Sequence, residues 1–189
     1  MTNNDVTSTN KIMQLAERVD VLEKEVKNLN ERLNKNKFTI LLMSGDLDKA
    51  LVAFIVAAGA ITMGYQVTVY CTYWGLNLLK RKTIFKDTTI LEKMAKVMMP
   101  KGPDQASLSR MHMFGMGTKF FKVLMKKNHV VTLADLIETT RMLGVKLYAC
   151  EMTMGIMGMS RDELIENIEY GGVETYLKEV VGSEINFIV

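Results

Sequence analysis

Two cysteines are the residues of this 189-residue chain best suited to covalent chemistry. Cys150 directly follows the apolar run Val145 to Ala149, VKLYA, which has the composition of a buried strand. Cys71 lies inside a second run of this kind, QVTVYCT at residues 66–72. A cysteine acts as a nucleophile through its thiolate, so the surroundings of each sulfur decide its reactivity. Cys150, at the exit of its strand, is the first candidate nucleophile.

The segments that precede these cysteines predict a parallel sheet. Residues 38–43, FTILLM, have strand-forming character and stop at Ser44-Gly45-Asp46, where a helix can begin under a polar cap. The apolar run from Leu51 to Gly64 is shorter than the roughly 18 to 20 residues that cross a bilayer. It is interpreted as a buried helix that leads into the strand at 66–72, whose Val67, Val69 and Cys71 share one face. A strand, helix and strand in this order indicate parallel strands joined by a right-handed crossover.

The remaining pattern continues the alternation of helices and strands. Thr132 is suited to cap a helix that Gly144 ends, and Ser160 with Glu163 has the spacing of a capping box. The predicted elements are helices at 133–143, from 160 through Ile168, and at 173–181, and strands at 145–149 and 185–189. The chain is therefore predicted to be an α/β protein.

Cys150 is predicted to lie where open parallel sheets bind their ligands, beyond the carboxyl ends of the strands. A helix or turn that begins within residues 151–159 would direct backbone N–H groups toward the sulfur and favour the thiolate. Glu151 opposes ionisation if its carboxylate points at the sulfur. An inert, buried cysteine is the alternative at this position. Cys71 is either a core residue beside Val67 and Val69 or a second, resolving thiol.

The amino-terminal region predicts a coiled coil. Residues 1–11 are polar and are expected to form a flexible tail, whereas residues 12–36 are expected to form an amphipathic helix and a linker. Apolar residues recur at spacings of three and four, with Ile12, Val19, Val26 and Leu33 at a positions and Leu15, Leu22 and Leu29 at d positions. β-Branched residues at a favour parallel dimers. Packing on the chain's own domain and a trimer remain alternatives.

Charge is distributed unevenly along the chain, although the net charge is only +3. Residues 74–127 hold twelve Lys and Arg against three Asp and Glu, whereas residues 128–189 hold four against ten. The basic part includes an irregular, partly helical insertion at about 77–128. This asymmetry is consistent with a solvated charged face or with docking on an acidic partner or membrane surface. It contains no nucleic-acid reader motif, so nucleic acid is not an expected partner.

Several other classes of site lack a signature. His112 and His129 have no cysteine or histidine at zinc-ligand spacing, and no phosphate-binding or dinucleotide fingerprint is present. The methionines near His112, Met111, Met113 and Met116, are interpreted as flexible apolar filler in preference to a Cu(I) site. No metal is expected. The polar first ten residues are unlike an export signal, so a cytoplasmic location is expected.

Two motifs resemble a known family. The segment Tyr148-Ala149-Cys150-Glu151-Met152, followed by Met154, Gly158, Glu163 and Tyr170-Gly171-Gly172-Val173, and the segment 70–76, YCTYWGL, closely resemble the DsrE-like sulfurtransferase and sulfur-carrier family. The similarity extends over nearly all of residues 38–189 and is greatest to the larger members with an amino-terminal helix. This resemblance implies a doubly wound, mainly parallel sheet of four to five strands with flanking helices, and an oligomeric protein without an organic cofactor.

The resemblance also implies a site and a function. Cys150 matches the cysteine that carries sulfur as a persulfide and passes it from a donor protein to an acceptor protein, as a carrier or a sulfurtransferase. We expect Thr72, Trp74, Gly75, Glu151 and Met152 to line its pocket, with Cys71 as a candidate second thiol. Trp74 either walls this pocket or lies in the core. The rival functions are an oligomeric or membrane-surface adaptor without enzymatic activity and a thiol redox protein that uses Cys150 and Cys71.

Overall fold

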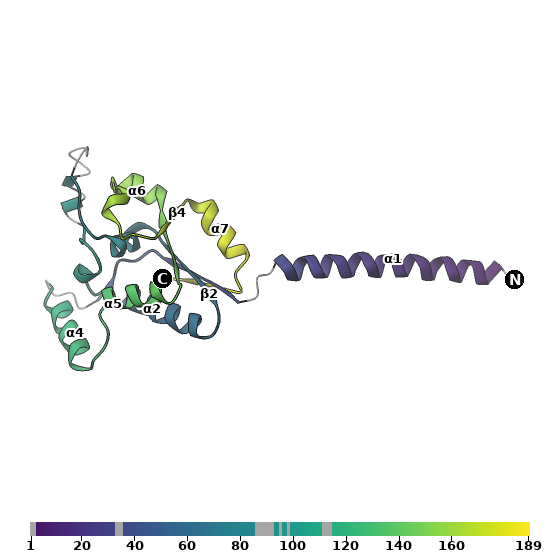
Figure 1. Ribbon diagram of the computed structural model, residues 1–189, viewed down its shortest axis with the longest axis horizontal. Helices are drawn as coiled ribbons and strands as arrows, with labels where there is room; N and C mark the ends of the chain where they lie inside the picture. Colours follow the sequence, from purple (N-terminus) through teal and green to yellow (C-terminus); the bar gives the residue numbers. More distant parts are fainter. Residues whose placement is uncertain (1–2, 33–35, 86–92, 95, 98, 111–114) are drawn as a thin grey trace. The chain divides into compact units, whose positions relative to one another are not determined.

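The computed structural model describes residues 3–32, 36–85, 93–94, 96–97, 99–110 and 115–189. The chain divides into two compact units, Met1–Lys35 and Asn36–Val189. The first unit consists of helix α1 (Asn3–Arg32), and the second is an α/β domain (Figure 1). The α/β domain contains both cysteines.

A five-stranded parallel sheet forms the centre of the domain, in the order β4-β3-β2-β1-β5. Its strands are β1 (Lys37–Leu42), β2 (Gln66–Cys71), β3 (Lys146–Cys150), β4 (Glu169–Gly171) and β5 (Ile185–Ile188). Helix α2 (Leu47–Thr62) connects β1 to β2. The three central strands are buried along most of their length, which explains their nearly continuous apolar character. The predicted α/β fold with a parallel sheet of four to five strands and flanking helices is confirmed.

The two faces of the sheet are packed differently. The larger core lies on the face that carries Ile40, Val69 and Leu147, and α2 and α5 (Leu133–Met142) contribute to it. The opposite face has a small cluster of Tyr70, Tyr148 and Cys150, with Tyr176 of α7 (Val173–Val181) packed against it. Figure 1 shows α7 on the side of the sheet opposite α2 and α5. The predicted shared face of Val67, Val69 and Cys71 belongs to the larger core, as their joint burial there shows.

The segment after the capping box is a correction to the sequence prediction. Ser160 and Glu163 form the capping box, but the turn that they begin is only a short 3-10 helix, η4 (Arg161–Glu163). Tertiary hydrogen bonds then hold the chain in an extended form, because Arg81 N donates to Glu163 O and Ile165 N donates to Leu79 O. The predicted helix through Ile168 is therefore absent from this segment, and the short strand β4 follows it.

A buried ion pair reinforces this departure. The ammonium of Lys96 contacts the carboxylate of Glu163, and both side chains are almost completely buried. A helix through this segment would compete with the backbone pairing of Leu164 and Lys80, which form an isolated antiparallel bridge. Tertiary contacts thus override the local helix signal.

The described part of the predicted insertion is partly helical. It contains the 3-10 helices η1 (Tyr73–Leu79) and η2 (Pro103–Gln105) and the helix α4 (Met116–Lys127). Met111, His112 and Met113 lie outside the described residues. Helix α6 (Glu151–Met157) directly follows β3. In the described residues, we find no helix with both the length and the apolar character needed to cross a membrane.

Helix α1 is longer than the sequence predicted. It begins at Asn3, so residues 3–11 are helical where a flexible tail was expected. Leu15, Val19, Leu22 and Val26, which occupy predicted a and d positions, are all exposed in this chain. These four side chains are not covered by other side chains of the described residues, and Leu33, a predicted a position, lies outside the described residues.

Candidate functional site

Cys150 occupies the junction between a strand and a helix. It is the last residue of β3 and the residue that precedes α6. In the sheet it pairs with Gly171 of β4, while its predecessor Ala149 pairs with Cys71 of β2. Its residue surface is only 4% exposed. The sulfur therefore lies at the carboxyl edge of the sheet, largely withdrawn from solvent.

Hydroxyl groups, and not only hydrocarbon, surround this sulfur. The hydroxyls of Thr72 and Thr153 are 2.9 Å apart and hydrogen-bonded, and both residues are buried. The backbone N–H of Tyr73 also donates to Thr153 Oγ1 at 3.2 Å. If Thr72 donates to Thr153 as well, the Thr153 oxygen accepts two hydrogen bonds and its own proton is available to the sulfur. This arrangement orients a donor toward Cys150.

These donors determine the ionisation of the thiol. Burial raises the pKa of Cys150, but hydrogen bonds from the side chains of Thr153, Thr72 and Tyr70 and from the backbone N–H of Thr153 lower it. The donors outweigh burial, so the pKa of Cys150 lies below that of an ordinary thiol. The side chain of Cys150 makes no capping hydrogen bond to α6. The hydrogen-bond donors near the sulfur favour the thiolate over the thiol.

The hydroxyl proton of Tyr70 has two possible acceptors, the carbonyl oxygen of Gly171 and the sulfur of Cys150. Its hydroxyl donates to the carbonyl oxygen of Gly171 at 2.7 Å. A hydroxyl has one proton, so donation to the sulfur requires Tyr70 to release Gly171. Burial, reinforced by interactions with Cys150 and Glu151, raises the pKa of Tyr70 well above its usual value. The phenol therefore stays protonated and remains a donor when Cys150 ionises.

The predicted pocket residues do not all surround the sulfur. Thr72 does, through the contacts described above. Gly75 packs its backbone against β1, and a Cβ at this position would overlap the carbonyl oxygen of Leu42. Glu151 and Met152 are exposed, and Glu151 forms an ion pair with Arg161 at 2.6 Å. Gly75 is thus required for the close approach of η1 to the sheet.

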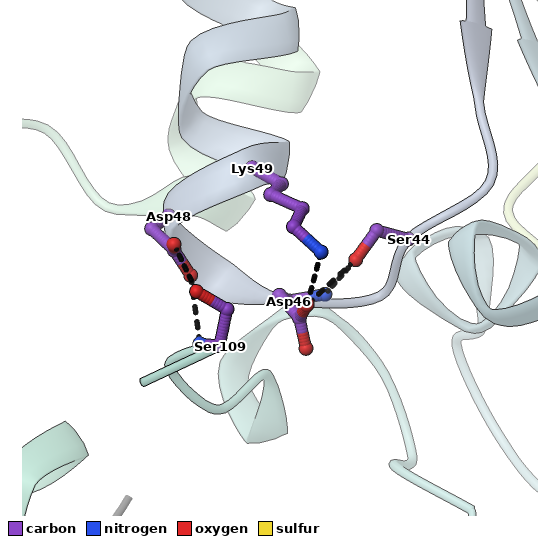
Figure 2. A network of polar contacts seen from close by, with 5 residues as sticks. All are labelled: Ser44, Asp46, Asp48, Lys49 and Ser109. Carbon is purple, nitrogen blue, oxygen red and sulfur yellow. Dashed lines mark hydrogen bonds and ion pairs between the residues drawn. The ribbon is translucent and has the colours of Figure 1, made fainter. Parts of the chain in front are cut away.

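Trp74 lies at a different cavity. Its side chain is 57% exposed and lines a cavity of about 480 Å³ together with Met43, Asp46 and Lys49, at the carboxyl end of β1. Three polar residues of this cavity, Ser44, Asp46 and Lys49, are paired with one another, as Figure 2 shows. Asp46 accepts hydrogen bonds from Ser44 and Lys49, each at 2.9 Å. The residues that line this cavity do not include Thr72, Thr153 or Cys150.

Asp48 belongs to the same network and has a structural role. It accepts hydrogen bonds from the backbone N–H and the hydroxyl of Ser109 (Figure 2). Burial raises the pKa of Asp48, but these hydrogen bonds outweigh it, and its pKa is lowered. The ionised carboxylate of Asp48 binds Ser109 and thereby links the insertion to the start of α2. Cys150 remains the candidate nucleophile at this edge of the sheet.

Cys71 is separated from Cys150 by the sheet itself. Its side chain is completely buried in the larger core, and burial raises its pKa to about 12. Cys71 pairs with Ala149, and side chains alternate between faces along a strand, so Cys150 points to the opposite face. A disulfide between them would require the strands to rearrange. The geometry therefore does not favour the redox alternative.

Sequence reasoning missed two residues of the site. Tyr70 lies on β2, and Thr72 directly follows the last residue of this strand in an extended conformation. The period of two along extended backbone therefore places Tyr70 on the face of Thr72. Thr153 is the third residue of α6, the position whose N–H is normally capped by the residue that precedes the helix. The positions of Tyr70 and Thr153 in their elements could be predicted from the sequence. Only the tertiary structure, which brings the end of β2 close to α6, shows that both residues lie near Cys150.

The α/β domain is similar to known proteins. A family model described as the DsrE/DsrF/DrsH-like family matches residues 34–188. The chain belongs to this family. The resemblance that we noted in the sequence is therefore confirmed, and the match covers the α/β domain that holds Cys150.

Two relatives extend the comparison within this family. The uncharacterized protein YrkE of Bacillus subtilis is 43% identical over 152 residues, which are 80% of this chain and 95% of YrkE. The sulfur carrier protein DsrE2 of Allochromatium vinosum is 32% identical over 157 residues, 81% of this chain and 98% of DsrE2. Among solved structures, the crystal structure of the ychN protein of E. coli aligns with a TM-score of 0.43 and 8% identity, and the alignment covers 82% of this chain and 99% of ychN.

Proposed function

We propose that this chain is a sulfur carrier that holds sulfane sulfur as a persulfide on Cys150. The observation that carries the proposal is a buried cysteine at the end of a strand, beside the hydrogen-bonded hydroxyls of Thr72 and Thr153, whose pKa is lowered by these neighbours. The relationship to a protein named as a sulfur carrier supports the same chemistry. Free thiols persist in a reducing compartment, so we place the protein in the cytoplasm.

The proposed transfer is two exchange steps without net oxidation. The Cys150 thiolate attacks the terminal sulfur of a donor persulfide, a new S–S bond forms, and the donor leaves as a thiolate after its own S–S bond breaks. A thiolate of the acceptor protein then attacks the terminal sulfur on Cys150, which is released as a thiolate. The donors around the sulfur stabilise the anion at both ends of the cycle. Electrons and atoms balance without a cofactor.

The burial of Cys150 adds a requirement for partners. A residue that is 4% exposed is protected from chance oxidation, but a donor must reach it at the carboxyl edge of the sheet. We infer that donor and acceptor proteins dock at this edge, where β3, β4 and the start of α6 meet. Donor and acceptor are therefore expected to compete for one surface.

The proposal is tested by intact-mass measurement after reduced protein is incubated with polysulfide. We expect an increase equal to one sulfur atom, sensitive to dithiothreitol, in the wild type and in Cys71→Ser, and no increase in Cys150→Ser. Cys71→Ser is the matched control because Cys71 is buried on the other face. Equal loading of wild type and Cys150→Ser would refute the assignment.

We further propose that α1 joins copies of the chain through its apolar seam. Leu22 occupies a d position of the seam, whereas Val21 is equally exposed but lies at a c position outside it. Light scattering coupled to size exclusion should show a lower oligomer mass for Leu22→Asp and an unchanged mass for Val21→Asp. Equal masses for both variants would exclude a coiled coil in this register, and any oligomer that persists in Leu22→Asp would be held by the α/β domain.

A further inference from the structure

Helix α4 presents large apolar side chains to solvent. Met116, Phe120 and Val123 are 65%, 62% and 64% exposed. Their spacing of four and three residues places them on one face of the helix. Thr118 and Met125 lie on the opposite face and are buried against the domain. An ordinary surface helix buries its apolar face, so α4 carries a second apolar face that the described chain leaves uncovered.

Lysines accompany this exposed face. Lys119, Lys126 and Lys127 are exposed, and no Asp or Glu lies within α4. Lys122 is half-buried and donates to the carbonyl oxygen of Asp104 at 2.6 Å. We define the α4 face as Met116, Phe120 and Val123 with the three exposed lysines. It combines apolar contact area with three lysines on a helix that has no acidic residue of its own, although Lys126 also lines a cavity that includes Asp104 and Asp135.

Helix α7 does not share this combination. Helix α7 also exposes apolar residues, namely Val173, Leu177 and Val181. Its charges are mixed, however, because Glu174 pairs with Lys178 at 2.9 Å. An exposed apolar stripe alone therefore does not select a partner, whereas the charge of α4 favours an anionic one.

We propose that the α4 face docks on an anionic lipid surface. A short helix with Phe and other apolar residues on its exposed side, flanked by Lys, lies in the plane of the interface, with its apolar residues at the acyl boundary and its lysines among the headgroups. The proposal concerns peripheral binding at the surface. It does not depend on sulfur transfer at Cys150.

The position of α4 favours a membrane over a protein that exchanges sulfur. Met125 of α4, Leu133 of α5 and Leu47 of α2 line a common cavity of about 590 Å³, so α4 packs beside these helices. Figure 1 shows α4 on the side of α2 and α5, away from α7. Cys150 belongs to the opposite face of the sheet. A protein that binds at the sulfur therefore need not contact the α4 face. A membrane bound at the α4 face leaves the sulfur accessible.

The test is co-sedimentation of the full chain with vesicles. We expect binding to vesicles of phosphatidylcholine and phosphatidylglycerol in equal parts, weakening with added salt, and no binding to phosphatidylcholine alone. Replacing Lys119, Lys126 and Lys127 by Gln should weaken binding by on the order of a hundredfold, at about fivefold per lysine. The double variant Phe120→Ser, Val123→Ser keeps every charge and should abolish sedimentation of the protein with the vesicles.

The matched control is Val173→Ser with Leu177→Ser, which removes an equal number of exposed apolar residues from α7. This variant should bind like the wild type. The proposal is overturned if the wild type does not bind the anionic vesicles at low salt, or if the α4 variants bind as well as the wild type. It is also overturned if the α7 variant loses binding equally, or if the α4 variants instead lower the oligomer mass, because the α4 face would then join copies of the chain.

Discussion

Replacing Thr153 tests the physical basis of the site. Thr153→Val keeps the shape of a side chain that is 1% exposed but removes the hydroxyl that helps to lower the pKa of Cys150. A hydrogen bond to a charged group contributes about 1.5 to 3 kcal/mol, so the thiolate should be destabilised by an amount in this range. The pKa of Cys150 should therefore rise, and the pH profile of its alkylation should move to higher pH.

The expected rate follows from two opposing effects. On the acidic side of the profile, the alkylation rate falls with the thiolate fraction. The more basic thiolate is also a better nucleophile, which offsets about half of the change. The net rate with iodoacetamide should fall about 4- to 12-fold in Thr153→Val on that side. On the alkaline side both proteins are ionised, and the variant should be equally fast or slightly faster.

Thr153→Ser supplies the control because it restores a hydroxyl at the same position. It should recover the wild-type profile, and thermal unfolding should show that both variants are folded. An unchanged profile in Thr153→Val would refute the role of this donor. A Thr153→Ser profile identical to that of Thr153→Val would indicate that packing, and not hydrogen bonding, controls the thiol.

Three further outcomes follow from the structure. Alkylation of the native protein at neutral pH should modify one thiol only, because Cys71 is fully buried with a pKa of about 12, and peptide mapping should find Cys71 labelled only after unfolding. Gly75→Ala should lower the free energy of unfolding in urea by more than about 2 kcal/mol, because the added Cβ would overlap backbone atoms. In Gly59→Ala of α2 the added Cβ meets nothing within 4 Å, and the free energy of unfolding should rise by about 0.5 to 1 kcal/mol. Equal effects of the two substitutions would contradict the packing of η1. Lys96→Met should destabilise the protein by about 3 to 5 kcal/mol, because it removes the ion-pair partner of the buried Glu163 carboxylate. A loss below about 1 kcal/mol, roughly the contribution of an exposed pair, would argue against that burial.

The alternation of strand and helix patterns along the sequence was sufficient to predict most of the fold. Strands β1, β2 and β3 are apolar runs whose ends are marked by Gly or polar residues. Helix α5 is capped by Thr132, which accepts a hydrogen bond from Asp135 N. Such signals act over a few residues and can be read from the chain. The segment from Glu163 to Ile168 could not be read in this way, because its backbone partners, Leu79 and Arg81, are remote in sequence.

The sequence by itself determined that Cys150 lies at the exit of a strand, that a helix or turn follows it and that the chain resembles a sulfur-carrier family. Only the tertiary structure decided what surrounds the sulfur. Thr72 and Thr153 are 81 residues apart, yet their hydroxyls meet because β2 and β3 are neighbours in the sheet. Cys71 is excluded from the same site by strand register, which turns its side chain to the other face. Ionisation of a buried thiol depends on such contacts between remote residues, because burial opposes the charge and only nearby donors can stabilise it.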